Sequence, residues 1–166
     1  MLNTKVQEAF NKQLNVELFS SYLYLSMGAY FESQNLKGMA SWMRAQAAEE
    51  NEHGMKFFGY INDRGGRVLL AKIEEPTTEW ASPLAVFEDA CKHEHKVTER
   101  INKLVELTAD EKDYASNTFL HWFVTEQVEE EATVEDIRDR LKRAGDNTVA
   151  LIMIDRELGM RARTQS

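Results

Sequence analysis

Glu50 and His53 lie three residues apart in a stretch that reads as one long helix, because no Gly, Pro or turn cluster interrupts it on the N-terminal side. At helical spacing both residues share a face with Trp42, Phe57 and Tyr60, which is the face that a packed helix turns inward. Carboxylates and imidazoles are side chains that bind metal ions. The pair therefore predicts a ligand site in the interior of the protein.

The same polar pattern occurs a second time along the chain. Glu94 follows Glu17 by 77 positions, and the same offset finds a polar partner for both other residues of the pattern. The corresponding pairs are Glu17 and Glu94, Glu50 and Gln127, and His53 and Glu130. Three matches at one offset, each at an inward position where an apolar residue is expected, indicate two related helical hairpins.

Four of these residues, Glu17, Glu50, Glu94 and Glu130, are carboxylates, and no Lys or Arg occupies an inward position near them. Burying one unpaired carboxylate costs several kcal/mol, whereas a domain is stable by only about 5 to 15 kcal/mol. Two divalent cations would balance the four charges. Oxygen-rich ligation with one imidazole suits iron, manganese or magnesium better than a structural zinc ion. We therefore predict a dinuclear metal centre that Glu50 is placed to bridge.

Four long helices are predicted to carry these residues. The two prolines, Pro76 and Pro83, lie close together, which leaves long uninterrupted stretches on both sides. Inward residues recur at steps of three and four in each stretch. Short joints at 33–38 and 108–113 separate the first helix from the second and the third from the fourth. Each of these pairs is therefore expected to be antiparallel.

The segment 64–81, which follows the second helix and precedes the third, is longer than the roughly 12 to 15 residues beyond which structureless loops become uncommon. Extended, it reaches about 60 Å, whereas a helix of about 28 residues spans about 42 Å. The segment is thus long enough to travel along the whole bundle, so that the second and third helices run parallel. The predicted fold is all-α, a four-helix bundle with one long crossover between helices 2 and 3.

The chain of 166 residues is predicted to be a single domain, 1–166. The bundle occupies about 4–144, and Gly145 is expected to end it. A short fifth helix is predicted at about 148–158, followed by Gly159.

Composition excludes several function classes. Lys and Arg total 20 and Asp and Glu total 28, and the net charge of −8 argues against nucleic acid or an anionic membrane as the main partner. The single cysteine, Cys91, excludes a disulfide framework and cysteine-based metal sites. The N-terminus lacks a signal-peptide layout and no run approaches a membrane span. We expect a cytoplasmic protein.

Four stretches carry a resemblance to a known family: "LNVELFSSYLYLSM" (14–27), "RAQAAEENEHGMKFFGYI" (44–61), "KHEHKVTERIN" (92–102) and "FLHWFVTEQVEEE" (119–131). They resemble the bacterial and archaeal non-haem ferritins, and the similarity covers essentially the whole chain. The resemblance implies a ferritin-like bundle with three iron sites. The first would be formed by Glu17, Glu50 and His53. The second would be formed by Glu50, Glu94 and Glu130, with Gln127 beside them. The third, on the cavity side, would be formed by Glu49, Glu126, Glu129 and Glu130. Tyr24 matches a tyrosine next to the di-iron centre.

The resemblance implies a ferroxidase. Two Fe(II) ions bind, dioxygen oxidises them, and Fe(III) moves to a mineral inside a hollow shell of 24 identical subunits. Glu49, Glu126 and Glu129 would lead from the centre to the cavity, and Tyr24 would donate an electron or a hydrogen bond. Within the shell, the short last helix would lie near the fourfold axis, and the apolar residues 68–70 would contact a twofold neighbour.

Several residues of this sequence differ from those of other ferritin subfamilies, and the differences indicate which subfamily it resembles. Bacterioferritins have Glu-x-x-His in the second and fourth helices, whereas the fourth helix here has Gln127 and Glu130. Asn51 replaces the methionine that binds their haem, so no haem is expected. Asn117 and Leu120 replace the acidic pore residues of animal ferritins, which puts that route for iron in doubt.

Two other functions stay open at this level. A di-iron oxidase or peroxidase would turn over an organic substrate or peroxide without storing iron. A metal-free helical interaction protein would not respond to a chelator or to Fe(II). Individual residues also have simpler readings: Glu49, Glu126 and Glu129 as a solvated helix face, and Tyr24 as a core aromatic residue. Trp122 is expected to pack, and His93, His95 and His121 to be surface or interface groups.

Overall fold

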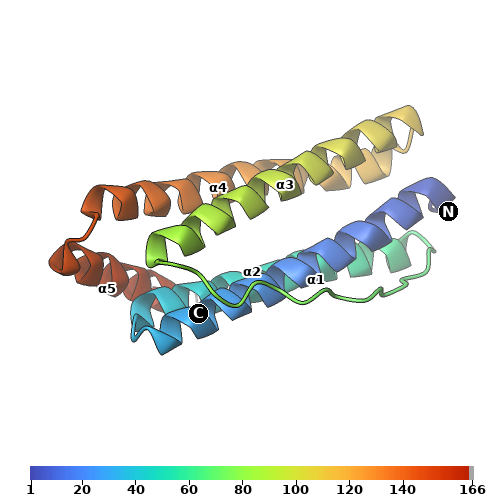
Figure 1. Cartoon of the computed structure of the whole chain (residues 1–166). Coiled ribbons are helices and arrows are strands. Elements are labelled where there is room, and N and C mark those ends of the chain that lie inside the picture. The colour runs from blue at the N-terminus through green and yellow to red at the C-terminus, as the bar shows by residue number, and fades with distance from the viewer. Residues whose placement is uncertain (165–166) are drawn as a thin grey trace.

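The computed structural model describes residues 1–164, and this part of the chain contains five α-helices and no strand (Figure 1). The helices are α1 (Thr4–Ser33), α2 (Lys37–Asp63), α3 (Pro83–Asp110), α4 (Tyr114–Ala144) and α5 (Thr148–Thr164). The first four form the bundle, and α5 lies across one end of it (Figure 1). The predicted all-α class, the four long helices and the single crossover are confirmed.

Side chains cap the starts of three helices of the bundle. Asn3 caps α1 by accepting a hydrogen bond from the backbone of Lys5, and Ser82 caps α3 by accepting one from Ala85. Asp113 caps α4 in the same way. Such caps satisfy backbone N–H groups that the first turn of a helix leaves without partners.

Both helical hairpins are antiparallel. In the first, Phe10 near the start of α1 meets Phe57 near the end of α2, with ring centroids 5.2 Å apart. In the second, Asn117 near the start of α4 donates a hydrogen bond to the carbonyl of Val105 near the end of α3. The second and third helices run parallel, as Figure 1 shows. The long connector makes this arrangement possible.

The connector, residues 64–82, runs along α1 for most of the length of the bundle (Figure 1). Side chains of α1 hold it through its backbone. Asn11 donates to the carbonyl of Arg67, Asn15 to that of Lys72, and Ser26 to that of Thr77. The connector therefore docks on α1 from its first turns to its last.

Two apolar clusters fill the interior and leave a polar layer between them. One surrounds Phe31, Met43 and Phe87 at the end near α5, and the other surrounds Phe10 and Phe57 at the opposite end. The buried carboxylates of the predicted centre lie in the layer between them. The two clusters thus fix the helices that carry the polar side chains.

Helix α5 is longer than predicted, because it continues through Gly159 to Thr164. Gly159 does not act as a helix stop. A Cβ atom added there would lie 3.0 Å from the Cα of Gly38, so this glycine allows α5 to approach α2 closely. Asp155 of α5 also accepts a hydrogen bond from the backbone N–H of Met39 at 2.8 Å, near the start of α2. No helix among the described residues combines the length and apolar character that a bilayer crossing requires.

Candidate metal centre

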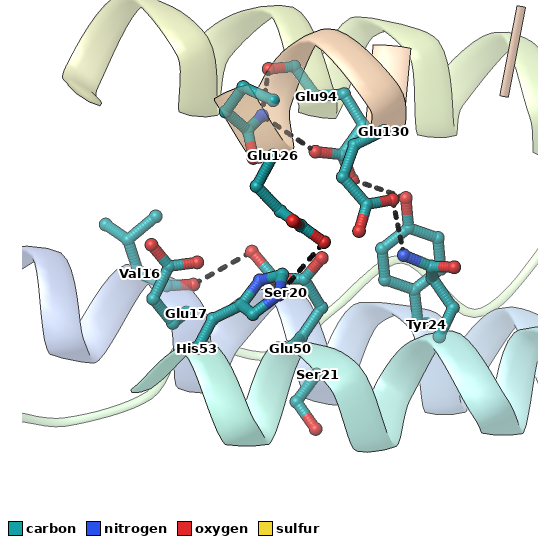
Figure 2. A network of polar contacts seen from close by, with 12 residues as sticks. Val16, Glu17, Ser20, Ser21, Tyr24, Glu50, His53, Glu94, Glu126 and Glu130 are labelled. Atoms are coloured by element: carbon teal, nitrogen blue, oxygen red, sulfur yellow. Dashed lines mark hydrogen bonds and ion pairs between the residues drawn. The ribbon is translucent and has the colours of Figure 1, made fainter. Parts of the chain in front are cut away.

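The polar layer holds four carboxylates and one imidazole, contributed by four helices. Their exposed fractions are between 1% and 6%. The residues are Glu17 from α1, Glu50 and His53 from α2, Glu94 from α3 and Glu130 from α4. The structure therefore brings the two halves of the repeated sequence pattern into one buried site, as Figure 2 shows.

Glu17, Glu50 and His53 form one group whose potential ligand atoms all lie within 4.8 Å of one another. His53 Nδ1 is 3.4 Å from Glu50 Oε2. These are the three residues predicted for the first iron site. The i, i+3 spacing in α2 places the imidazole and the carboxylate on one face, and α1 supplies the third ligand from across the hairpin.

Of the second predicted set, Glu50, Glu94 and Glu130 with Gln127, only Glu94 and Gln127 are hydrogen-bonded to each other. Gln127 Nε2 donates to Glu94 Oε2 at 3.2 Å and to Thr98 Oγ1 at 3.2 Å. Glu130 belongs to a second compact group with His53 and Glu126. Gln127 therefore lies where it orients Glu94 through its amide nitrogen.

Two buried amides that sequence reasoning did not assign to the site also bind its carboxylates. Gln13 Nε2 donates to Glu17 Oε1 at 2.7 Å, and Gln46 Nε2 donates to Glu130 Oε2 at 2.6 Å. Both glutamines occupy inward positions one turn before a predicted ligand in their own helix. That position is the sequence signal that could have found them.

Tyr24 is buried beside the centre and donates a hydrogen bond to Glu94 Oε1. Its ring meets that of His93 edge-on at 6.5 Å between centroids. His93 was expected at the surface or an interface, but it is partly buried, with Nε2 2.7 Å from Ser20 Oγ. Burial lowers the pKa of His93 to about 4. It packs behind Tyr24 and not among the carboxylates.

The remaining predicted residues line a cavity of about 210 Å³ on the α2 and α4 side of the centre. Its lining includes Glu49, Glu126, Glu129 and Glu130. Glu126 points from α4 toward His53, with Oε1 3.9 Å from Nε2 (Figure 2). Glu130 thus belongs both to the buried centre and to the cavity wall.

The electrostatics of the centre favour cations. Burial raises the pKa of Glu17 to about 7 and that of Glu130 to about 9, and it also raises the pKa values of Glu50 and Glu94. No Lys or Arg of the described chain forms an ion pair with these four. Without metal these carboxyl groups therefore bind protons more tightly than free side chains do, and a metal ion competes with those protons.

His53 has the form that metal ligation needs. Burial lowers its pKa to about 4, so the imidazole is neutral at physiological pH. One ring nitrogen then carries a hydrogen and the other a lone pair, and neighbouring groups decide which is which. Trp122 packs edge-on against it at 5.3 Å, and the Lys56 ammonium lies 4.5 Å from the centre of the Trp122 ring. Trp122 thus packs against His53 and Phe123, as predicted, but 41% of it stays exposed. Neutral imidazole and carboxylate donors together fit a hard, doubly charged transition-metal ion.

Comparison with known proteins gives a consistent result. A sequence model of the ferritin-like domain matches residues 7–144, which covers the four helices of the bundle. A bacterial non-heme ferritin of Bacteroides fragilis is 45% identical over 161 residues, with 97% of this chain and 100% of the relative covered. A bacterial non-heme ferritin of Staphylococcus saprophyticus is 41% identical over 166 residues, covering 100% and 99%.

Solved structures give the same picture. A structure described as an open pore ferritin from the hyperthermophilic archaeon Archaeoglobus fulgidus superposes with a TM-score of 0.95 at 51% identity, covering 96% of this chain and 98% of that one. A closed form of the Archaeoglobus fulgidus ferritin, engineered by site-directed mutagenesis, superposes with a TM-score of 0.96 at 50% identity, covering 97% and 98%.

Proposed function

The chain belongs to the ferritin family and is an iron-storage protein, and from its buried centre we propose that it oxidises Fe(II) with dioxygen before storing the iron as Fe(III). One observation carries the proposal. Four carboxylates and a neutral imidazole converge in the interior without a cationic side chain among them. Two Fe(II) ions supply the charge that this arrangement lacks.

In the proposed reaction, Glu17 and His53 hold one Fe(II), Glu94 and Glu130 hold the other, and Glu50 lies between them. The protons on the carboxyl groups leave as the ions bind. Each Fe(II) gives one electron to dioxygen, and with two protons the product is hydrogen peroxide. Carboxylate oxygens are hard ligands that bind Fe(III) more strongly than Fe(II), so the site favours the oxidised state.

Tyr24 and Gln127 act on Glu94 in this proposal. Their hydrogen bonds engage both of its carboxylate oxygens before metal binds. The bonds hold the side chain on the α3 side of the centre, where it can turn to a metal ion with little loss of conformational entropy.

Oxidised iron then leaves through the cavity on the α2 and α4 side. Glu130 belongs to the centre and to the cavity, and Glu49, Glu126 and Glu129 continue the set of oxygen ligands outward. We propose a third iron site among these four residues. Haem has no part in the proposal.

We further propose that the chain assembles into a shell of 24 copies. Apolar side chains are exposed both on the connector and on α5, among them Leu69, Leu70, Val149 and Met153. Contact with neighbouring copies would remove these surfaces from water.

The test combines iron chemistry with particle size. Apoprotein is loaded with Fe(II) under argon and exposed to air, and Fe(III) absorbance, iron per subunit and particle mass are followed together. Rapid oxidation with hundreds of iron atoms retained per large particle is the expected result. Oxidation without retention would instead indicate an oxidase, and the absence of oxidation would contradict the ferroxidase proposal.

A further inference from the structure

Gln46 makes the shortest amide contact in the centre. Its side chain is only 5% exposed, and Nε2 donates to Glu130 Oε2 at 2.6 Å, from α2 to α4. An amide buried at this depth needs a partner, because an unsatisfied polar group costs about 1 to 3 kcal/mol. The described structure gives it this single acceptor.

Glu130 is the carboxylate that two groups of ligands share. It forms a compact group with His53 and Glu126, and it lines the cavity together with Glu49 and Glu129. Gln46 lines the same cavity. The hydrogen bond from Gln46 therefore acts at the point where iron would pass from the centre to the exit.

We propose that Gln46 is a positioning residue that holds Glu130 toward the second iron and thereby sets how long oxidised iron stays at the centre. The hydrogen bond to Oε2 fixes the orientation of the carboxylate, and both oxygens keep lone pairs for a metal ion. Without the amide, Glu130 can turn to Glu49 and Glu126, and the second iron loses a fixed ligand. The inference rests on the proposed ferroxidase function and adds a residue that controls the release of oxidised iron.

Gln13 provides a matched control. It makes the same kind of bond, from a buried amide to a ligand carboxylate, but to Glu17 at the first site and away from the cavity. Loss of a group that orients a metal ligand typically costs 10- to 100-fold in metal affinity. Gln46→Met should therefore weaken one ion by about this factor, and Gln13→Met the other.

The first experiment measures binding with a metal that needs no oxidation. Parent, Gln46→Met and Gln13→Met proteins are titrated with Zn(II) by calorimetry, and crystals equilibrated at limiting Zn(II) report by anomalous scattering which position empties. The position at Glu94 and Glu130 should empty in Gln46→Met, and that at Glu17 and His53 in Gln13→Met. Equal filling of both positions in Gln46→Met, or equal loss from both, would overturn the proposal.

A shorter amide tests whether the geometry matters. Gln46→Asn keeps the amide but is one methylene too short to reach Glu130. It should behave as Gln46→Met does in the Zn(II) titration. Parental affinity in Gln46→Asn would overturn the proposal, because it would mean that any polar group at this position suffices.

The second experiment follows residence of the iron. Two Fe(II) per subunit are oxidised, and further pairs are added after increasing delays; rapid oxidation returns only when the centre has been vacated. We expect recovery to be several-fold faster in Gln46→Met than in the parent. Parental recovery in Gln46→Met would overturn the proposal. If the parent shows no rapid oxidation at all, the ferroxidase proposal fails, and the Zn(II) titration still decides the role of Gln46.

Discussion

Tyr24 of α1 donates its phenolic hydrogen to Glu94 of α3, and this bond joins the two hairpins of the bundle inside the polar layer (Figure 2). The other carboxylate oxygen of Glu94 accepts from Gln127. In the metal-free protein each carboxylate oxygen of Glu94 therefore accepts one hydrogen bond. Both oxygens keep a lone pair with which Glu94 can bind a metal ion while it stays oriented.

Replacing Tyr24 by Phe should destabilise the apoprotein by about 1 to 3 kcal/mol, because Glu94 loses a buried donor. It should also slow the first oxidation of Fe(II), since Glu94 is then less well oriented. Tyr22 is exposed on the same helix, so Tyr22→Phe is the matched control. Denaturant unfolding and stopped-flow oxidation provide the two readouts. Equal stability and equal oxidation rates of the two variants would contradict the proposed role of Tyr24.

Replacing Glu50 by Ala should abolish tight binding of both ions, because Glu50 is proposed to contact both. Initial oxidation should fall by at least about 100-fold, the upper end of the effect expected for a supporting residue alone. Glu52 lies exposed two positions later in α2 and gives the control Glu52→Ala. Stoichiometry from Zn(II) calorimetry and the oxidation rate are measured. Retention of one tight ion in Glu50→Ala would contradict the bridging role.

The apoprotein should become less stable as the pH rises from neutral to alkaline. The carboxyl groups of Glu17 and Glu130 have pKa values of about 7 and about 9 when folded, against 4.5 for the free side chain. Below about pH 6.5 the buried His53 and His93, whose pKa values are lowered to about 4, oppose this effect because they are protonated only in the unfolded state. Between about pH 6.5 and 9 the folded state binds more protons than the unfolded state, so the free energy of unfolding falls with increasing pH.

Chemical denaturation of chelator-treated protein at pH 5, 7 and 9 measures this slope. Glu130→Gln should flatten its upper part, since the group that titrates there is gone. Saturating Zn(II) should reverse the slope, because metal competes with protons for the same carboxylates. Stability of the apoprotein that rises from pH 7 to pH 9 would contradict the electrostatic account.

Metal should stabilise the fold. An ion that binds only the folded state adds about 2.7 kcal/mol per site at a concentration 100 times its Kd. Zn(II) should therefore raise the Tm of the parent and leave that of a Glu17→Ala, Glu50→Ala double variant almost unchanged. A Tm that is indifferent to Zn(II) and to chelator in the parent is what a metal-free helical protein would give.

Gly38 should not tolerate a side chain. A Cβ atom there would lie 1.6 Å from the carbonyl oxygen of Asp155, so Gly38→Ala must displace α5 from α2 and cost about 1 to 3 kcal/mol. Gly59, also in α2, has no atom within 4 Å of an added Cβ. Gly59→Ala should stabilise the helix by up to about 1 kcal/mol. Thermal unfolding of the two variants should therefore shift in opposite directions.

The fold and the residues of the buried polar layer could be predicted because the spacing of apolar and polar residues determines which side chains face inward. The offset that relates Glu17 to Glu94 and His53 to Glu130 places polar groups at matching heights of two hairpins, and burial leaves them few ways to be satisfied. Helix starts at Ser82 and at Asn3 follow from local capping, which needs no knowledge of the rest of the chain.

Other features depend on contacts between distant segments and could not be read from spacing. The inward position of Gln46, one turn before Glu50, marks it as a candidate for the centre, but only the structure shows that its amide reaches Glu130 on another helix. His93 was expected outside because it flanks an inward residue, yet α1 covers it through Ser20. Glycine is common just after the end of a helix, which is why Gly159 was expected to stop α5. The structure shows instead that Gly159 lies inside the helix and allows close approach to Gly38.

The path of the connector is encoded in α1. Asn11, Asn15 and Ser26 bind carbonyl groups of the connector and not its side chains. Residues such as Leu69 and Leu70 are consequently free to diverge without unseating the segment that bears them. Substitutions at such exposed positions could therefore change the surface that the connector presents while the residues of the buried centre stay the same.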